Sequence, residues 1–197
     1  MASIFDVTSQ LTFYGAYHSN RTNILVHVIC VPILLWTFQV LASQLPVPSV
    51  IPAIHHQFNE YLTFDLNWAT IHAGVYFLYY LALEPVGALL YGPQLILSLL
   101  SATTCARNTD NISLAGIVHL MTWVAQFLSH GLAEKRAPAL LDNLVGAVVL
   151  APFFVHLEVL FKLGYRPKFY RSLQNEIGKE IAKVRKAQGD EKRKKNL

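Results

Sequence analysis

The chain has 197 residues, of which 53% are hydrophobic and only 14% are charged. A soluble domain typically carries about 25% charged residues, so this composition excludes a protein with water on all sides. The formal net charge is +4, but twelve of the sixteen Lys and Arg residues lie from Lys162 onward. We therefore expect no nucleic-acid partner. An apolar body with a basic tail predicts a membrane protein, whose tail is a solvated charged helix or lies against anionic lipid.

Four stretches have the apolar character of membrane-spanning helices, which need ~20 residues to cross a bilayer. They cover residues 24–42, 68–83, 86–106 and 112–133, and the second is marginal in length. Pro85 separates the second stretch from the third. Proline disfavours helix in the residue before it, so these two stretches predict a tight helical hairpin. The expected fold is an all-α, polytopic membrane helix bundle with about four spanning helices.

A fifth apolar stretch, residues 139–161, differs from the others. It contains Asp142, Glu158 and a central Pro152, and its uncharged part is shorter than a span requires. This pattern predicts two short helices that dip into the membrane and return, or that lie at its interface. We expect residues 1–168 to form the membrane-embedded domain and residues 169–197 to form a basic cytosolic tail.

The charges in the loops predict the orientation of the chain. The loop of residues 43–67 has Glu60 and Asp65 but no Lys or Arg, which favours a location outside the cytosol. Arg21, the Lys135-Arg136 pair and the tail are then cytosolic. Four spans satisfy this arrangement with both termini in the cytosol.

The chain ends in Lys194-Lys195-Asn196-Leu197. Lysines third and fourth from a cytosolic C-terminus resemble the di-lysine retrieval signal of endoplasmic reticulum membrane proteins. The ending therefore favours a multi-pass protein of the endoplasmic reticulum membrane.

The first polar cluster lies at the start of the first span. Asn23 and His27 are four residues apart, so they share a helix face. His18 and His27 are nine apart and would face opposite ways on one continuous helix. However, good N-cap residues lie between them: Ser19, Asn20 and Thr22. We expect one helix to end near His18 and another to begin just after it, which can turn His18 towards His27.

The second polar cluster lies on the last of the four spans. Its members are spaced by 4, 3, 4 and 4 residues, so they form one stripe on an otherwise apolar helix: His119, Trp123, Gln126, His130 and Glu134. A single polar stripe on a membrane helix is expected to face the interior of the bundle.

Depth in the membrane shows which histidines can meet. His27 lies about 6 Å into its helix from Asn23, and His130 lies about 6 Å from Glu134. Both helix ends are cytosolic by the charge argument, so His27 and His130 can meet His18 at one level. His119 lies eleven residues further along, roughly 16 Å deeper. We therefore exclude His119 from the same set of ligands.

Three imidazoles with open remaining positions suit a catalytic Fe(II) or Zn(II) ion. Asn23, Gln126 and Glu134 are candidates for the groups that orient the imidazoles, and Glu134 is also a candidate carboxylate ligand. A second interpretation stays open. Each histidine can simply bond to a neighbouring helix, in a non-enzymatic membrane scaffold or lipid-binding protein.

The polar clusters belong to two longer sequence motifs. The first motif comprises Phe13-Tyr14, Tyr17-His18, Asn23, His27 and Val31-Pro32. The second comprises Gln126-Phe127, His130-Gly131, Glu134-Lys135-Arg136, Pro138-Ala139-Leu140, Asp142-Asn143-Leu144, Ala151-Pro152, Glu158, Leu160-Phe161 and Gly164-Tyr165. These two motifs resemble those of the fungal 2-hydroxy fatty acid (2-hydroxy-palmitic acid) dioxygenases of the endoplasmic reticulum membrane. The resemblance covers residues 11 to about 168, although residues 43–113 match only as hydrophobic spans.

The resemblance implies an Fe(II)-dependent dioxygenase that uses O2 to shorten long-chain 2-hydroxy fatty acids by one carbon, an α-oxidation step in phytosphingosine breakdown. It implies that the catalytic iron is bound by His18, His27 and His130. A 2-hydroxy carboxylate can chelate a metal through two oxygens, and three histidines leave positions for this chelate and O2. The basic residues near the site either steer the substrate carboxylate or anchor the protein at the membrane surface: Arg21, Lys135 and Arg136.

Overall fold

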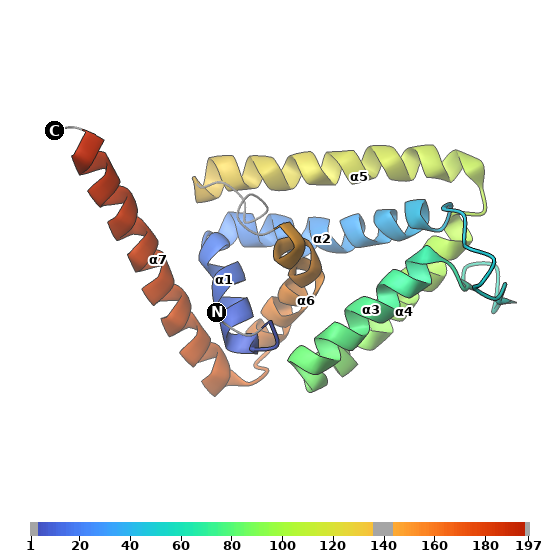
Figure 1. Cartoon of the computed structure of the whole chain (residues 1–197), viewed down its shortest axis with the longest axis horizontal. Coiled ribbons are helices and arrows are strands. Elements are labelled where there is room, and N and C mark those ends of the chain that lie inside the picture. The colour runs from blue at the N-terminus through green and yellow to red at the C-terminus, as the bar shows by residue number, and fades with distance from the viewer. Residues whose placement is uncertain (1–3, 136–143, 196–197) are drawn as a thin grey trace.

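The computed structural model describes residues 4–135 and 144–195, which form seven α-helices, one short π-helix and one β-hairpin (Figure 1). In chain order the elements are α1 (Val7–Tyr17), α2 (Arg21–Ala42), β1 (His55–Gln57), β2 (Thr63–Asp65), α3 (Trp68–Leu83), α4 (Pro85–Cys105), α5 (Thr109–Ser129), η1 (His130–Glu134), α6 (Leu144–Lys162) and α7 (Pro167–Lys195). The predicted helical bundle is confirmed. The small antiparallel hairpin, which pairs His56 with Phe64, was not predicted.

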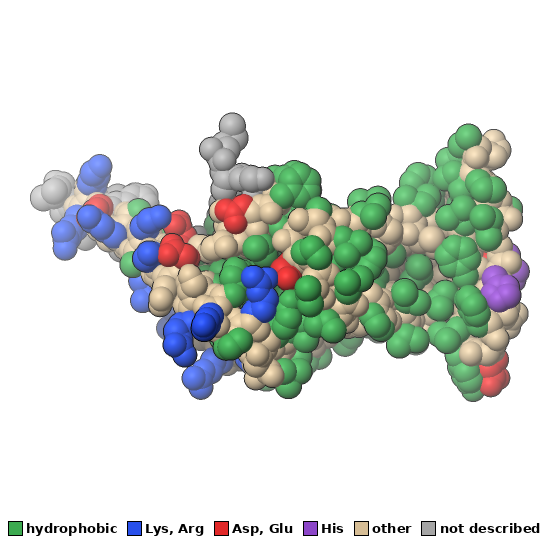
Figure 2. Space-filling view, turned by 90° about the horizontal axis from the view of Figure 1, so that it is seen from below, with side chains coloured by type: hydrophobic (Ala, Val, Ile, Leu, Met, Phe, Trp, Pro, Cys, Tyr) green, Lys and Arg blue, Asp and Glu red, His purple; other side chains and the backbone are tan. Residues whose placement is uncertain are grey.

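Within the described residues, three helical segments are long and apolar enough to cross a membrane: α2, α4 and the joined α5–η1 segment Thr109–Glu134. The fourth predicted span, α3, has the expected bounds but only 16 residues. It forms the predicted hairpin with α4, and Glu84 separates the two helices. Figure 2 shows apolar side chains over the middle of the molecule and Lys and Arg gathered at the α7 end. This distribution is that of a membrane protein.

Short polar side chains determine where the helices begin. Asn20 accepts a hydrogen bond from the backbone N–H of Thr22 at 2.9 Å and caps α2. Glu84 caps α4 in the same way, through the N–H of Gly87 at 2.5 Å. The predicted break after His18 is confirmed, since α1 ends at Tyr17 and α2 begins at Arg21.

The expectation of two short helices in residues 139–161 is wrong for the part that the structure describes. Residues 139–143 lie outside the described residues, and α6 runs as one helix through Pro152. A proline inside a helix removes one backbone hydrogen bond. Here the residues on both sides of Pro152 are anchored in the core, because Leu150, Phe153 and Leu157 are fully buried. Tertiary packing therefore outweighs the local cost of the proline.

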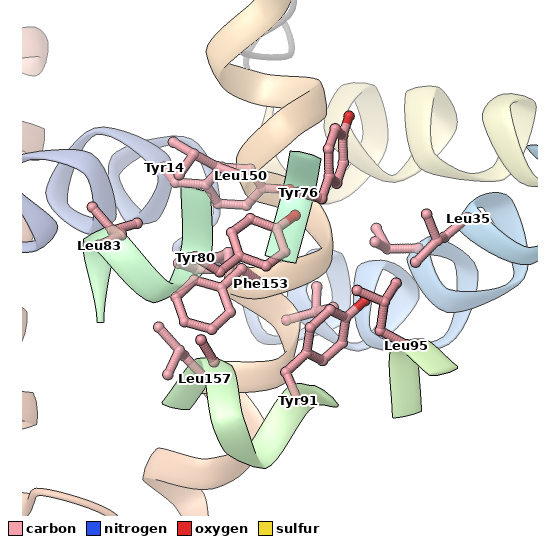
Figure 3. Packing of buried hydrophobic residues seen from close by; sticks show 14 of the residues in the cluster. Tyr14, Leu35, Tyr76, Tyr80, Leu83, Tyr91, Leu95, Leu150, Phe153 and Leu157 are labelled. Carbon is pink, nitrogen blue, oxygen red and sulfur yellow. The ribbon is translucent and has the colours of Figure 1, made fainter. Parts of the chain in front are cut away.

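Aromatic packing fixes α6 against α3 and α4 (Figure 3). The rings of Tyr80 and Phe153 stack with centroids 4.5 Å apart and planes inclined by 8°. The hydroxyl of Tyr80 donates a hydrogen bond of 2.6 Å to the backbone oxygen of Val149. Such stacked pairs add to the free energy gained by burial alone. They hold α6 in place as one wall of the site described below.

The first half of α7 packs against α1. Leu173 and Ile177 are buried in the same core as Leu11. Gly15 faces Ile177 so closely that a methyl group at Gly15 would overlap the isoleucine side chain. The division into an embedded domain of residues 1–168 and a cytosolic tail of residues 169–197 stays a prediction.

Candidate metal centre

Three buried histidines from two helix junctions lie side by side. His18 follows α1, His27 lies in the second turn of α2, and His130 begins η1. Each offers one ring nitrogen, and these nitrogens lie within 4.8 Å of one another. Their exposed fractions are only 5%, 4% and 3%. The structure thus brings together the three imidazoles that were expected to meet at one depth.

Backbone hydrogen bonds determine which nitrogen of two of these rings is free. His18 Nδ1 lies 2.8 Å from the carbonyl oxygen of Tyr14, and His27 Nδ1 lies 2.9 Å from that of Asn23. A carbonyl oxygen can only accept, so each Nδ1 donates, and the lone pair of a neutral ring lies on Nε2. His18 Nε2 is buried and has no hydrogen-bond partner among the described residues. A buried polar atom without a partner is costly, and a metal ion would satisfy it.

The environment of His18 keeps its ring neutral. The ring stacks on Tyr14 with centroids 4.1 Å apart and lies near Phe154. Burial, together with the neighbouring His27, holds the pKa of His18 well below its ordinary value. A neutral imidazole is the form that binds metal. The residues present therefore fit a metal ion bound by imidazole nitrogens.

Glu134 connects the end of η1 to the turn between α1 and α2. Its carboxylate accepts hydrogen bonds from the backbone N–H of Ser19 at 3.1 Å, from that of Asn20 at 2.9 Å and from the side chain of Asn23 at 3.2 Å. The hydroxyl of Ser19 donates to it as well. Both carboxylate oxygens are engaged in this way. Glu134 therefore holds the residues that follow His18 against the helix that carries His130.

Asn23, in α2, links the end of α1 to the end of α5. It is completely buried, and its Nδ2 donates to the backbone oxygen of Tyr17 at 3.4 Å. Its Oδ1 accepts a hydrogen bond of 2.6 Å from the hydroxyl of Ser129, next to His130. No role of Ser129 was predicted, and its position directly before His130 was the one available signal in the sequence. Asn23 and Ser129 together fix α2 against the end of α5.

The helix that carries the second cluster ends in a π-helical turn. Such turns often occur at functional sites, and η1 places His130 at its start and Glu134 at its end. Lys135 follows with a left-handed backbone (φ 54°), and its N–H bonds to the carbonyl oxygen of His130. The turn thus stops the helix directly after Glu134.

Three of the four remaining predicted site residues lie in the part of the chain that the structure describes. Gln126 is buried and donates a hydrogen bond of 3.2 Å to Thr122 of its own helix, and its side chain lines the same cavity as the histidines. Arg21 and Lys135 are exposed at the start of α2 and after η1. Arg136 lies outside the described residues.

A cavity of about 340 Å³ extends from the three histidines between α2, α3, α5 and α6. Its lining is mostly apolar and aromatic, as is typical of small-molecule sites. His119 also lines it, but both of its ring nitrogens are engaged. Nδ1 lies 2.9 Å from the Thr37 hydroxyl, and Nε2 accepts from Trp123 Nε1 at 3.2 Å. His119 is thus apart from the three-histidine group, as expected from its depth.

Comparison with known proteins places the chain in a family. The family model described as "2-hydroxy-palmitic acid dioxygenase Mpo1-like" matches residues 4–163. The chain is 33% identical over 176 residues to the 2-hydroxy-palmitic acid dioxygenase MPO1 of Saccharomyces cerevisiae. The aligned residues make up 88% of this chain and 91% of that protein. No solved structure matches the chain. The resemblance in the sequence motifs is thus confirmed, and the chain belongs to the Mpo1-like family.

Proposed function

We propose that this protein is an Fe(II)-dependent dioxygenase that shortens long-chain 2-hydroxy fatty acids by one carbon. The observation that carries the proposal is the group of three buried imidazoles at one end of an apolar cavity. Membership of a family named for a 2-hydroxy-palmitic acid dioxygenase supports it. The same membership argues against a non-enzymatic scaffold with purely structural histidines.

His18, His27 and His130 would hold the iron. When bound, the iron supplies positions for the two oxygens of a 2-hydroxy carboxylate and for O2. The chain itself contributes the orientation of the ring nitrogens, since the backbone oxygens of Tyr14 and Asn23 fix two of the rings. Such outer partners typically raise metal affinity by 10–100-fold.

The cavity would bind the alkyl chain of the substrate and exclude water from the metal centre. Apolar side chains of α2 and α5 line it beyond the histidines, among them Val31, Leu35 and Phe127. Arg21 and Lys135 are exposed near the histidine end and would attract the carboxylate of an acid arriving from the membrane surface. A role of Arg136 in the same attraction stays a prediction.

The protein would lie in the endoplasmic reticulum membrane with both termini in the cytosol. The gathering of Lys and Arg at the α7 end (Figure 2) supports this orientation, because basic residues favour the cytosolic side. Protease protection of tags on the two termini in sealed microsomes tests the orientation, and both tags should be cleaved from outside.

Iron content measured together with O2-dependent turnover tests the proposed reaction. The purified full-length protein in lipid nanodiscs should contain stoichiometric iron and convert a 2-hydroxy fatty acid into the acid one carbon shorter. His27→Ala and His130→Ala should lose both properties, whereas His56→Ala, in the exposed hairpin, should keep them. Protein without iron, or full turnover by the first two variants, would leave the lipid-binding interpretation in place.

A further inference from the structure

The cavity is an elongated groove whose two ends differ. On α2 it is lined from His27 to Phe38, and on α5 from His130 back to His119. Each pair is eleven residues apart, which corresponds to ~16 Å along a helix. The groove therefore follows both helices away from the histidines. A ligand held at the three imidazoles would point its remaining length along this path.

One side of the groove reaches the surface of the protein. Three of its lining residues are partly exposed: Phe38, Phe127 and Val148. They belong to three different helices, α2, α5 and α6. In the membrane, this apolar side would admit an alkyl chain from the bilayer.

Three rings in contact, inclined to one another by 54° and 45°, lie at the end of the groove that is far from the three histidines. The ring centroids of Phe38 and His72 are 4.7 Å apart, and those of His72 and Tyr76 are 3.9 Å apart. This ring stack, defined as Phe38, His72 and Tyr76, connects α2 to α3. It blocks the straight continuation of the groove.

His72 adds a second ring to this barrier. Its side chain lines the groove beside Phe38, and its Nδ1 is buried and has no hydrogen-bond partner among the described residues. The far end is thus closed to a longer alkyl chain by the rings of Phe38 and His72.

We propose that the ring stack is the end stop of the alkyl-chain groove, so that Phe38 and His72 set the longest 2-hydroxy fatty acid that the protein converts. This inference rests on the proposed function, which places the carboxylate end of the acid at the three histidines. An acid with further methylene groups has to displace the ring of Phe38 or that of His72. Acids that end before the ring stack contact neither residue.

A chain-length series of saturated 2-hydroxy acids tests the end stop in the full-length protein in nanodiscs. Phe38→Ala removes the first blocking ring, and His72→Leu replaces the second ring by a flexible aliphatic side chain. Each variant should raise kcat/KM at least about tenfold for acids just beyond the wild-type limit, since one methylene in an apolar pocket typically changes kcat/KM by 10–200-fold. Shorter acids should be unaffected, and Phe38→Trp should move the limit to shorter acids.

Ile33→Ala is the matched control, because Ile33 lies on the same helix and is exposed outside the groove. Ile33→Ala should leave the longest acid that the protein converts unchanged. If the wild-type protein converts the series and neither Phe38→Ala nor His72→Leu moves the limit, the end stop is wrong.

A binding measurement separates this inference from the proposed reaction. Trp123 lines the groove, so its fluorescence, isolated by Trp36→Phe and Trp68→Phe, should be quenched by 2-hydroxy acids brominated on the last carbon. Quenching should fall for acids beyond the length limit and recover in Phe38→Ala. Length-dependent quenching without any turnover would refute the proposed reaction alone. Quenching with the same length dependence in Phe38→Ala would refute the end stop.

Discussion

Two histidines that line the same cavity, His18 and His119, differ in whether both of their ring nitrogens have a hydrogen-bond partner. His18 is hydrogen-bonded through one nitrogen only, and its Nε2 is buried without a partner among the described residues. His119 has both nitrogens engaged, with Thr37 on one side and Trp123 on the other. The first arrangement leaves a lone pair for a ligand, and the second uses the whole ring to join two helices. Burial on a polar helix stripe therefore does not by itself identify a metal ligand.

The strongest test of this contrast removes one histidine from each site. His18→Ala should abolish stoichiometric iron and lower turnover to background, because two imidazoles leave the ion poorly held. His119→Ala should keep its iron and lose only the stabilising contacts to Thr37 and Trp123. Metal analysis and O2 consumption measure both variants. Equal loss of iron in the two variants would contradict the distinction.

Glu134→Gln should have the next largest effect. The amide keeps the size of the side chain but removes the charge that strengthens the hydrogen bonds from Ser19, Asn20 and Asn23. We expect metal affinity to fall by about 10–100-fold, as for other groups that orient ligands. Competition with a chelator measures the affinity. Glu60→Gln, in the exposed loop, is the control and should bind metal like the wild type.

Ser129→Ala should have a smaller effect, because it removes a single hydrogen bond to Asn23. Loss of one partner of a buried pair typically costs ~1–3 kcal/mol. The free energy of unfolding should fall by about this amount, with a several-fold loss of metal affinity at most. Thermal unfolding with and without metal measures both, and an unchanged stability would show that Asn23 does not need this partner.

Thr37→Val should have the smallest effect of the four. It removes the contact to His119 Nδ1 while it keeps the shape of the side chain, so the loss should be ~1 kcal/mol of stability. Iron content and turnover should stay at the wild-type level. A loss of iron in this variant would show that the His119 site and the three-histidine site are coupled.

Helical spacing and capping were enough to predict the meeting of the three histidines. The N-cap chemistry of Asn20 marked the break that turns His18 towards His27, and the shared depth of His27 and His130 followed from the charges that flank their helices. The boundary between α3 and α4 was likewise predicted, because Pro85 separates two apolar stretches.

Features that depend on contacts between distant segments were not predictable from spacing. The continuity of α6 through Pro152 comes from the burial of Phe153 and its neighbours against α3 and α4. The contact between Ser129 and Asn23 and the ring stack of Phe38 with His72 join residues that no local pattern relates. The π-helical turn at His130 likewise has no sequence signal of its own.

X-ray absorption at the iron edge of the purified protein tests whether the three histidines bind the iron. We predict iron coordinated by imidazole nitrogens, with one imidazole lost from the spectrum in a variant such as His18→Ala that is reconstituted with excess iron. Iron that lacks imidazole ligands, or a spectrum that is the same in wild type and His18→Ala, would contradict the assignment of the three histidines.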